Sequence, residues 1–399
     1  MAMSEFDQVE LLTGAGARDL IAHALGTEGS DLIECAVHAL HHRPGAGVSA
    51  GYTITVRTPG GATEEQYICA TTGRISNPST PGRVRLEHPS GEVTVHVWRH
   101  PHDPELPALP AACDSDTISR LLEVPASVSI VSYRPTRRCV VKVEGRAGTL
   151  AFLKVVRPKL FPDLVRRHEI LTAAGLPVPR ITHTDDRGLV ALTAAPGRPM
   201  AHYLSAGVDD DAATLDAVVG MLDLLPDSVT SLPKHPSWSE RVDYYGHAAA
   251  TALPSEAERA RGVAAEVVRM MQSSDPGPVV PTHGDFYEAN IFLSSPTEVS
   301  ALLDVDAVGP GHRVDDLACL LGHVSVLPCL APTSYPEVPH TLVLWWEYLA
   351  AQVDRTALAA RAAAVTLSLV AGAKKTQGEA WRQDALERLA QAEHWLTLG

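Results

Sequence analysis

The residues best suited to chemistry lie in one short stretch, THGDFYEANIF, at residues 282–292. Asp285 in this stretch is a carboxylate that can accept a proton. Asn290 offers an amide oxygen five residues later, and Asp304 offers a second carboxylate 14 residues after Asn290. Phosphoryl transfer needs a carboxylate to orient and deprotonate the acceptor hydroxyl, and oxygen ligands for the Mg²⁺ ions that bridge the phosphates. We therefore predict Asp285 as the catalytic base and Asn290 and Asp304 as ligands of Mg²⁺.

Two more acidic residues lie in the following segment, DVDAVGPGHRVDDLA. Asp306 points to the same side of an extended segment as Asp304, because side chains alternate along such a segment. It could join the metal site or contact a substrate, or it could be a solvated loop residue. Asp316 lies at the start of a predicted helix, where a carboxylate is favourable beside the positive end of the helix dipole.

The pattern H-G-D-x4-N, followed by a hydrophobic residue and Asp, resembles the catalytic and metal-binding loops of the aminoglycoside phosphotransferase and choline kinase superfamily. These enzymes are small-molecule relatives of protein kinases, and the resemblance covers about residues 130–330. It implies an ATP- and Mg²⁺-dependent phosphotransferase with an alcohol group as acceptor. It also implies that His283 holds the loop by side-chain contacts and that Asp316 braces the loop.

The same resemblance assigns nucleotide-binding roles upstream of the loop. Lys154 in the strand-like segment AFLKVV corresponds to the lysine that contacts the phosphates, and Glu169 in RRHEIL corresponds to the glutamate that pairs with this lysine. Thr193 and Ala195 fall in the segment that presents backbone groups to adenine. These four residues are predicted to bind ATP.

One departure from the family concerns the cover of the phosphates. The segment YRPTRRCVVKV contains no G-x-G-x-x-G loop. We therefore expect the phosphates to be covered either by another backbone arrangement or by the guanidinium groups of Arg137 and Arg138. Guanidinium groups form paired hydrogen bonds with phosphate oxygens.

The elements that must position these residues form an α+β pattern. Residues 48–98 and 129–156 alternate β-type runs with Gly and Pro turns, and the residues after 156 are mostly helical, with a hairpin at 290–306 and three helices at the C-terminal end. The first forty residues also look helical. We predict a bilobal protein-kinase-like fold made of an N-terminal α/β cap module at 1–110, a small β-rich nucleotide lobe at 111–196 and a large, mainly helical acceptor lobe at 197–399.

The cap module has a sequence pattern similar to that of the nucleotide lobe. Each has an Arg-Pro pair, a strand, a Gly turn and a second strand, and the alignment sets Phe152-Leu153-Lys154 against Tyr67-Ile68-Cys69. This indicates a degenerate copy that lacks the lysine, although two unrelated hairpins of similar composition would look alike. A cap of this kind resembles the layout of bacterial maltokinases and glucosamine kinases.

Composition excludes several classes of protein. The 399 residues include 33 Lys and Arg against 47 Asp and Glu, a formal net charge of −14, which disfavours general nucleic-acid binding. The six cysteines form no C-x-x-C pair, and the N-terminal residues have no apolar core typical of a signal peptide. We expect a cytoplasmic protein without a membrane or nucleic-acid partner.

The histidines of the cap match no established spacing of metal ligands. Metal binding in the cap is therefore a minor alternative, and its candidate ligands are His38, His41, His42, His96, His100 and His102 with Asp103.

Charge also bears on the acceptor. Residues 131–200 hold 13 Lys and Arg and five Asp and Glu, whereas residues 201–330 hold six and 19. An acidic acceptor lobe concentrates cations, so a cationic amino sugar of the glucosamine type is predicted, although acidic helices also simply keep proteins soluble. An aminoglycoside antibiotic, a neutral sugar as in maltokinases, and a pseudokinase scaffold are the alternatives. Trp345 and Glu347 could hold the sugar ring, unless these C-terminal residues pack a helical core.

Overall fold

The computed structural model describes residues 3–26, 31–42, 45–58, 60–76, 82–88, 91–207, 211–375 and 380–399. The chain divides into two compact units. The first comprises Met1–Pro162 and Ile181–Ala194, and the second comprises Asp163–Arg180 and Ala195–Gly399. The domain boundaries predicted near residues 110 and 196 stay predictions.

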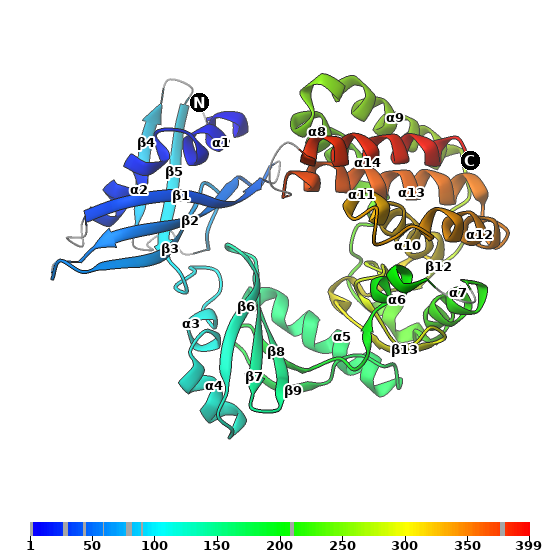
Figure 1. The fold of residues 1–399 in the computed structure, drawn as a ribbon, viewed down its shortest axis with the longest axis horizontal. Helices are drawn as coiled ribbons and strands as arrows, with labels where there is room; N and C mark the ends of the chain where they lie inside the picture. The colour runs from blue at the N-terminus through cyan, green and yellow to red at the C-terminus, as the bar shows by residue number, and fades with distance from the viewer. Residues whose placement is uncertain are drawn as a thin grey trace. The chain divides into compact units, whose positions relative to one another are not determined.

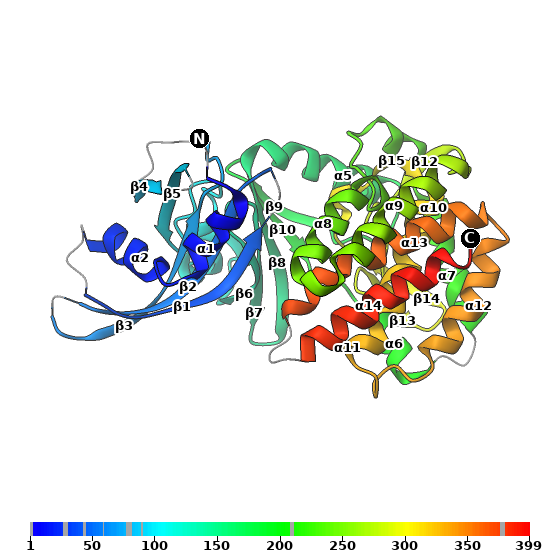
Figure 2. The ribbon, with the colours of Figure 1, turned by 90° about the horizontal axis from the view of Figure 1, so that it is seen from above.

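The first unit begins with a five-stranded antiparallel sheet whose strand order is β1-β2-β3-β5-β4. Two helices lie against one face of it (Figures 1 and 2), and Leu12 and Ile21 of these helices pack on the alternate residues Val48, Tyr52 and Ile54. The elements are α1 (Glu5–Thr13), α2 (Ala17–Leu25), β1 (Asp31–His42), β2 (Val48–Arg57), β3 (Thr63–Thr71), β4 (Arg83–His88) and β5 (Gly91–Arg99).

The expectation of helix through the first forty residues is wrong for residues 31–42, which form β1. The pairing of β1 with β2 shifts register between Leu32 and Glu34 and again between Val37 and Ala39. Each such irregularity breaks the alternation of apolar and polar residues by which a strand is recognised. The period of two is therefore hidden in the sequence.

A second five-stranded antiparallel sheet follows in the first unit, with the order β6-β7-β8-β10-β9. Two short helices cover one face, where Leu109 and Ile118 pack with Cys139 and Leu153. Asp114 caps the second helix by accepting from the N–H groups of the first helical turn. The elements are α3 (Leu109–Ala112), α4 (Ser115–Leu122), β6 (Ser127–Arg134), β7 (Arg138–Gly145), β8 (Gly148–Val156), β9 (Ile181–Asp185) and β10 (Leu189–Thr193).

The two sheets have the same strand order, and the middle strand of each has nine residues. Aligning β3 with β8 places Cys69 at the position of Lys154. Cys69 lies opposite Trp98 of β5, and Lys154 lies opposite Val190 of β10. Both lie on the face of their sheet that the helices do not cover, because the core under the helices uses their neighbours in sequence.

The second unit is mainly helical, with two small sheets of order β11-β13-β14 and β12-β15. The predicted hairpin at 290–306 is confirmed as β13 and β14, and the predicted C-terminal helices are confirmed as α12, α13 and α14. The elements are α5 (Phe161–Ala173), β11 (Arg198–Pro199), α6 (Met200–Ala206), α7 (Asp211–Gly220), α8 (Val242–Ala252), α9 (Ala257–Ser273), β12 (Val279–Thr282), β13 (Ile291–Ser295), β14 (Glu298–Leu302), β15 (Gly309–His312), α10 (Arg313–Ser325), α11 (Leu327–Leu330), α12 (Val338–Ala350), α13 (Arg355–Val370) and α14 (Ala380–Leu396), with short 3₁₀ segments η2 to η8 between them.

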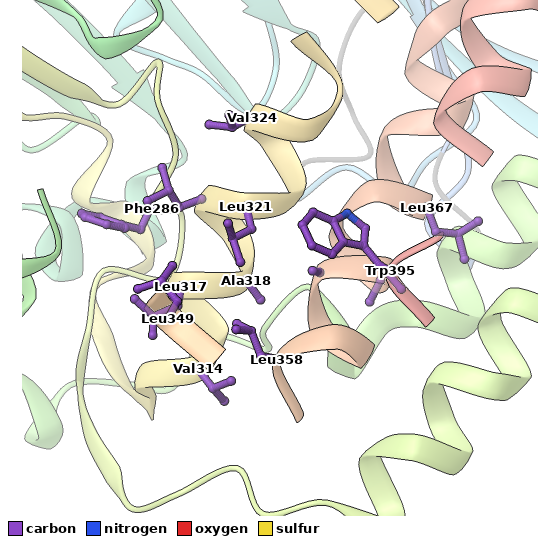
Figure 3. Packing of buried hydrophobic residues seen from close by; sticks show 14 of the residues in the cluster. Phe286, Val314, Leu317, Ala318, Leu321, Val324, Leu349, Leu358, Leu367 and Trp395 are labelled. Carbon is purple, nitrogen blue, oxygen red and sulfur yellow. The ribbon is translucent and has the colours of Figure 1, made fainter. Parts of the chain in front are cut away.

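The core of this unit joins the helices to the loop between β12 and β13. Figure 3 shows Phe286 of that loop pointing toward Leu317 and Leu321 of α10. The central helix is α13, most of whose residues are buried. By length and composition alone, Arg355–Ala373 is the one segment in the described part of the chain that could cross a membrane, and 72% of its most apolar window is buried inside the protein.

Candidate active site

The loop that carries the predicted catalytic residues runs from His283 to Asn290, between β12 and β13. Gly284 has a φ of +78°, and a Cβ there would lie 2.8 Å from the carbonyl oxygen of Ala307. Only glycine satisfies both conditions without strain. The glycine of the H-G-D sequence therefore allows the loop to pass close to residues 305–307.

Asp316 at the start of α10 holds the backbone of the loop by hydrogen bonds. Its carboxylate accepts hydrogen bonds from the backbone N–H of His283 at 2.7 Å and of Gly284 at 2.8 Å. The side chain is fully buried, and burial raises the pKa of Asp316 to about 7, while the two N–H donors act in the opposite direction. The geometry is that of a brace for the loop backbone.

We expect Asp316→Asn to lower the free energy of unfolding by about 1–3 kcal/mol. An amide has one oxygen, so one of the two loop N–H groups would face an NH₂ group and lose its acceptor. Urea unfolding followed by tryptophan fluorescence measures the change. The exposed Asp227→Asn serves as the control and should stay within about 0.5 kcal/mol of the wild type. An unfolding midpoint for Asp316→Asn equal to that of the wild type would contradict the role as a brace.

His283 is a buried, neutral residue in this structure. Its Nδ1 accepts from the N–H of Asp285 at 3.3 Å, and its Nε2 lies 3.0 Å from the carbonyl oxygen of Leu303. Since Nδ1 accepts, Nε2 carries the proton and donates to Leu303. Burial lowers the pKa of His283 to about 4. These contacts fit the structural role implied by the family resemblance.

Asp285 and Asn290 lie at the two ends of one tight loop and are joined by hydrogen bonds. The side-chain N–H₂ of Asn290 donates to the backbone oxygen of Asp285 at 3.0 Å and lies 3.4 Å from its carboxylate Oδ2. The amide nitrogen is thereby used inside the loop. The amide oxygen of Asn290 is the atom with the chemistry of a metal ligand.

Asp304 lies two residues after the end of β14 and precedes the 3₁₀ segment Val305–Ala307, with its backbone in the left-handed region at φ 53° and ψ 50°. Aspartate tolerates this conformation better than most residues. Leu303, the residue before Asp304, donates its N–H to the carbonyl oxygen of Asn290 at 2.8 Å and accepts from His283, so Asp304 lies beside the loop. The charge of Asp306 raises the pKa of His283 and acts on Arg167 and His235.

The donor set fits Mg²⁺ of the kind that also binds phosphates. No three His, Cys, Asp or Glu side chains gather into a metal site of their own in the described part of the chain. Mg²⁺ in phosphoryl-transfer sites characteristically takes one or two protein oxygens together with substrate phosphates. The carboxylate of Asp304 and the amide oxygen of Asn290 supply such a pair.

The sequence analysis missed a buried carboxylate within the loop itself. Glu288 is 6% exposed, and its Oε2 has no hydrogen-bond partner. Burial, together with the charge of Asp285, raises the pKa of Glu288 to about 7. Tyr287 lies among three carboxylates, since the charges of Asp285, Glu288 and Asp304 all raise its pKa in addition to burial. Its ring stacks on His323 of α10, with ring centres 4.1 Å apart. The only signal in the sequence was the Glu three residues after Asp285.

The predicted nucleotide-binding residues are divided between the two units. Lys154 is a buried residue on β8 and Thr193 is the last residue of β10, both in the first unit. Glu169 on α5 and Ala195 belong to the second unit. The predicted pairing of Lys154 with Glu169, and the adenine contacts of Thr193 and Ala195, stay predictions.

The two residues proposed to hold a sugar ring have other partners in α12. Trp345 is 1% exposed, and its indole N–H donates to the carbonyl oxygen of Asp211 at 3.0 Å. This agrees with burial in a helical core and not with contact to a sugar. Glu347 is exposed and forms an ion pair with Arg355 at 3.1 Å.

The fold and the loop define a protein-kinase-like phosphotransferase. Residues 138–328 match the model of the phosphotransferase enzyme family that includes the aminoglycoside phosphotransferases. This match confirms the predicted resemblance to the aminoglycoside phosphotransferase and choline kinase superfamily, and the protein is a phosphotransferase that acts on hydroxyl groups.

Solved structures share the fold at low sequence identity. A thermostable mutant of the aminoglycoside phosphotransferase APH(4)-Ia is 12% identical, with 71% of this chain and 98% of that chain covered and a TM-score of 0.52. The macrolide 2'-phosphotransferase MphH from Brachybacterium faecium (17% identity, 69% and 97% covered, TM-score 0.41) and an ethanolamine kinase of Plasmodium vivax (13%, 67% and 82%, 0.45) also match. No curated protein matches the chain. The bilobal α+β fold class predicted from the sequence is confirmed.

Proposed function

We propose that this enzyme transfers the γ-phosphoryl group of ATP to a hydroxyl of a cationic amino sugar of the glucosamine type. The observation that carries the proposal is the loop itself. Asp316 holds its backbone by two hydrogen bonds, Asn290 ties the far end of the loop to Asp285, and Asp304 lies just past the end of β14.

The roles follow from the chemistry of each group. Asp285 orients the acceptor hydroxyl and takes its proton, and the hydrogen bonds of Asn290 fix the position of Asp285. Mg²⁺, when bound, would neutralise negative charge that develops on the phosphates. Asn290 and Asp304 would hold this ion, and Lys154 would supply a positive charge to the phosphates.

The preference for a cationic acceptor rests on carboxylates near Asp285. Asp285, Glu288 and Asp304 all act on Tyr287, and Asp306 acts on His283. Mg²⁺ offsets part of this negative charge. The buried oxygen of Glu288 is out of reach of a ligand, so its contribution is electrostatic, and such fields are strong where water is excluded.

Release of ADP in the presence of Mg²⁺-ATP tests the proposal against a panel of acceptors. Glucosamine, N-acetylglucosamine, glucose, maltose, choline and several aminoglycosides distinguish the possible classes. We expect turnover with glucosamine and little with its neutral analogues. Turnover with aminoglycosides alone would make this an antibiotic-modifying enzyme, and turnover with neutral sugars would contradict the preference for a cation. Nucleotide binding without any turnover would favour a pseudokinase.

Glu288→Gln should raise the KM for glucosamine about 3- to 10-fold and leave the KM for glucose, where glucose is a substrate, within about twofold. The measurement is made at pH 8, above the raised pKa of Glu288 of about 7, where the carboxylate is charged, and glutamine keeps the shape of the side chain while removing that charge. Initial-rate kinetics with both acceptors measure the two values. Equal effects on the charged and the neutral acceptor would show that Glu288 supports the loop and does not select charge.

A further inference from the structure

The turn between β6 and β7 occupies the place of the glycine-rich loop that this chain lacks. The N–H of Arg137 donates to the carbonyl oxygen of Arg134 at 3.0 Å, which closes a four-residue turn with Pro135 and Thr136 at its centre. Arg138, the first residue of β7, lies opposite Val156 of β8. The turn is therefore at the same end of the sheet as Lys154, and Arg138 is on the same face as Lys154 because residues two apart on a strand share a face.

Thr136 has an unfavourable backbone conformation. Its φ is +62°, the left-handed region that the third position of a type II turn requires and that glycine usually supplies. A β-branched residue is a genuine outlier there. Residues held in such a conformation need surrounding contacts that fix them, and outliers of this kind are found at ligand-binding sites.

Two charged side chains supply those contacts to the backbone of Thr136. Oδ2 of Asp103 accepts from the N–H of Thr136 at 2.7 Å, and Nε of Arg157 donates to the carbonyl oxygen of Thr136. Arg157 in turn lies 3.5 Å from the carboxylate of Glu105, which accepts from the hydroxyl of Ser76 at 3.0 Å. The peptide units on both sides of Thr136 are thus each held by one charged side chain.

The same carboxylate also joins the two sheets of the first unit. Asp103 is 4% exposed and belongs to the segment that follows β5 of the cap. Its Oδ2 accepts from the hydroxyl of Tyr133 on β6 at 2.7 Å, and its Oδ1 accepts from the N–H of Glu105 at 2.9 Å. Trp98 donates to the Tyr133 hydroxyl at 3.2 Å.

The face of the cap sheet that corresponds to the nucleotide face contributes to this junction. Cys69, the counterpart of Lys154, is fully buried, and its Sγ lies 3.8 Å from the hydroxyl of Tyr133. Trp98 is its neighbour on β5. At the position where the nucleotide lobe has Lys154, predicted to contact phosphates, the cap has Cys69, which contacts Tyr133 of the nucleotide lobe.

We infer that the cap positions the phosphate-covering turn: Asp103 of the cap directly, and Glu105 of the cap through Arg157, are positioning residues that hold Thr136, and through it Arg137 and Arg138, over the phosphates of the bound nucleotide. This inference rests on the proposed function, because it assigns the turn a part in ATP binding. It gives the cap a role in nucleotide affinity and none in the choice of acceptor.

The consequence to test is that the loss of affinity depends on phosphates. Arg157→Ala and Asp103→Ala should each weaken ATP and ADP binding about tenfold, as expected when a buried hydrogen bond to a charged group is lost, and leave AMP and adenosine binding within about twofold. Isothermal titration calorimetry on the full chain, with adenosine measured by competition, gives the four dissociation constants. Arg157 is the more exposed of the two residues, so its variant keeps the test valid if Asp103→Ala fails to fold.

Trp98→Phe is the matched control, because it removes one hydrogen bond to Tyr133 at the same junction without touching Thr136. It should bind all four ligands as the wild type does. If Arg157→Ala binds ATP as tightly as the wild type, or loses ATP and adenosine affinity equally, the inference is wrong. If the wild type itself binds no ATP, the proposed function is wrong. That result differs from both outcomes for Arg157→Ala, which concern only the role of the turn.

Discussion

Asp285→Asn is expected to lower kcat by about 10²- to 10⁴-fold while the affinity for ATP stays nearly unchanged. The amide cannot accept the proton of the acceptor hydroxyl. The loop should keep its shape, since the hydrogen bond from Asn290 to the backbone oxygen of residue 285 remains, as do the two from the loop to Asp316. The loss should therefore fall on the chemical step.

Two measurements separate this outcome from simple damage. Steady-state ADP release gives kcat, and calorimetric titration gives the dissociation constant for ATP of the same preparation. Asp227→Asn, an exposed aspartate of the same unit, is the control for the substitution itself. Turnover of Asp285→Asn close to that of the wild type would refute the assignment of Asp285 as the base.

The second large effect is expected at Asp304. Asp304→Asn should lower kcat/KM by more than about 10²-fold at a Mg²⁺ concentration that saturates the wild type. Loss of a group behind a metal ligand commonly costs up to about 10²-fold, so loss of a charged ligand should cost more. Asparagine is the informative replacement because it tolerates the left-handed backbone at φ 53° as aspartate does.

The dependence of the rate on metal concentration identifies the cause. For Asp304→Asn, we expect the half-saturating Mg²⁺ concentration to rise and the melting temperature to stay near that of the wild type. Asp304→Ala should lose activity and also stability, because alanine strains the backbone there. An unchanged Mg²⁺ requirement in an inactive Asp304→Asn would show that Asp304 does not hold the metal.

The arrangement of the predicted catalytic loop could be read from the sequence because its residues lie close together in the chain. Asp285 and Asn290 are five residues apart, and Asp304 comes just after the hairpin that follows, so spacing alone predicts their proximity. The contacts of Asp316 with His283 and Gly284 join residues more than thirty apart. The sequence could indicate this brace only through the resemblance to a family.

Other features had no local signal. The junction of Asp103 with Tyr133 joins two modules across thirty residues and depends on one buried hydroxyl. The two register shifts in β1 interrupt the alternation typical of a strand, and the sequence of this segment therefore predicts a helix. Trp345 lies between the exposed Leu344 and the buried Trp346 on α12, so the sequence could not distinguish a sugar platform from a core position. Only the helix's packing against α7, through Asp211, decides the matter.

The two sheets of the first unit, alike in strand order but different at the lysine position, have a consequence for where the chain can vary. Two sheets of one architecture need only one residue that touches phosphate between them. With Cys69 at the position of the lysine, the cap sheet has no such residue there and uses this face to contact the nucleotide lobe. We expect sequence variation among relatives to be high over most of the cap and low where the cap meets Tyr133 and Thr136, so that the boundary between the two sheets is the part of the cap under the strongest constraint.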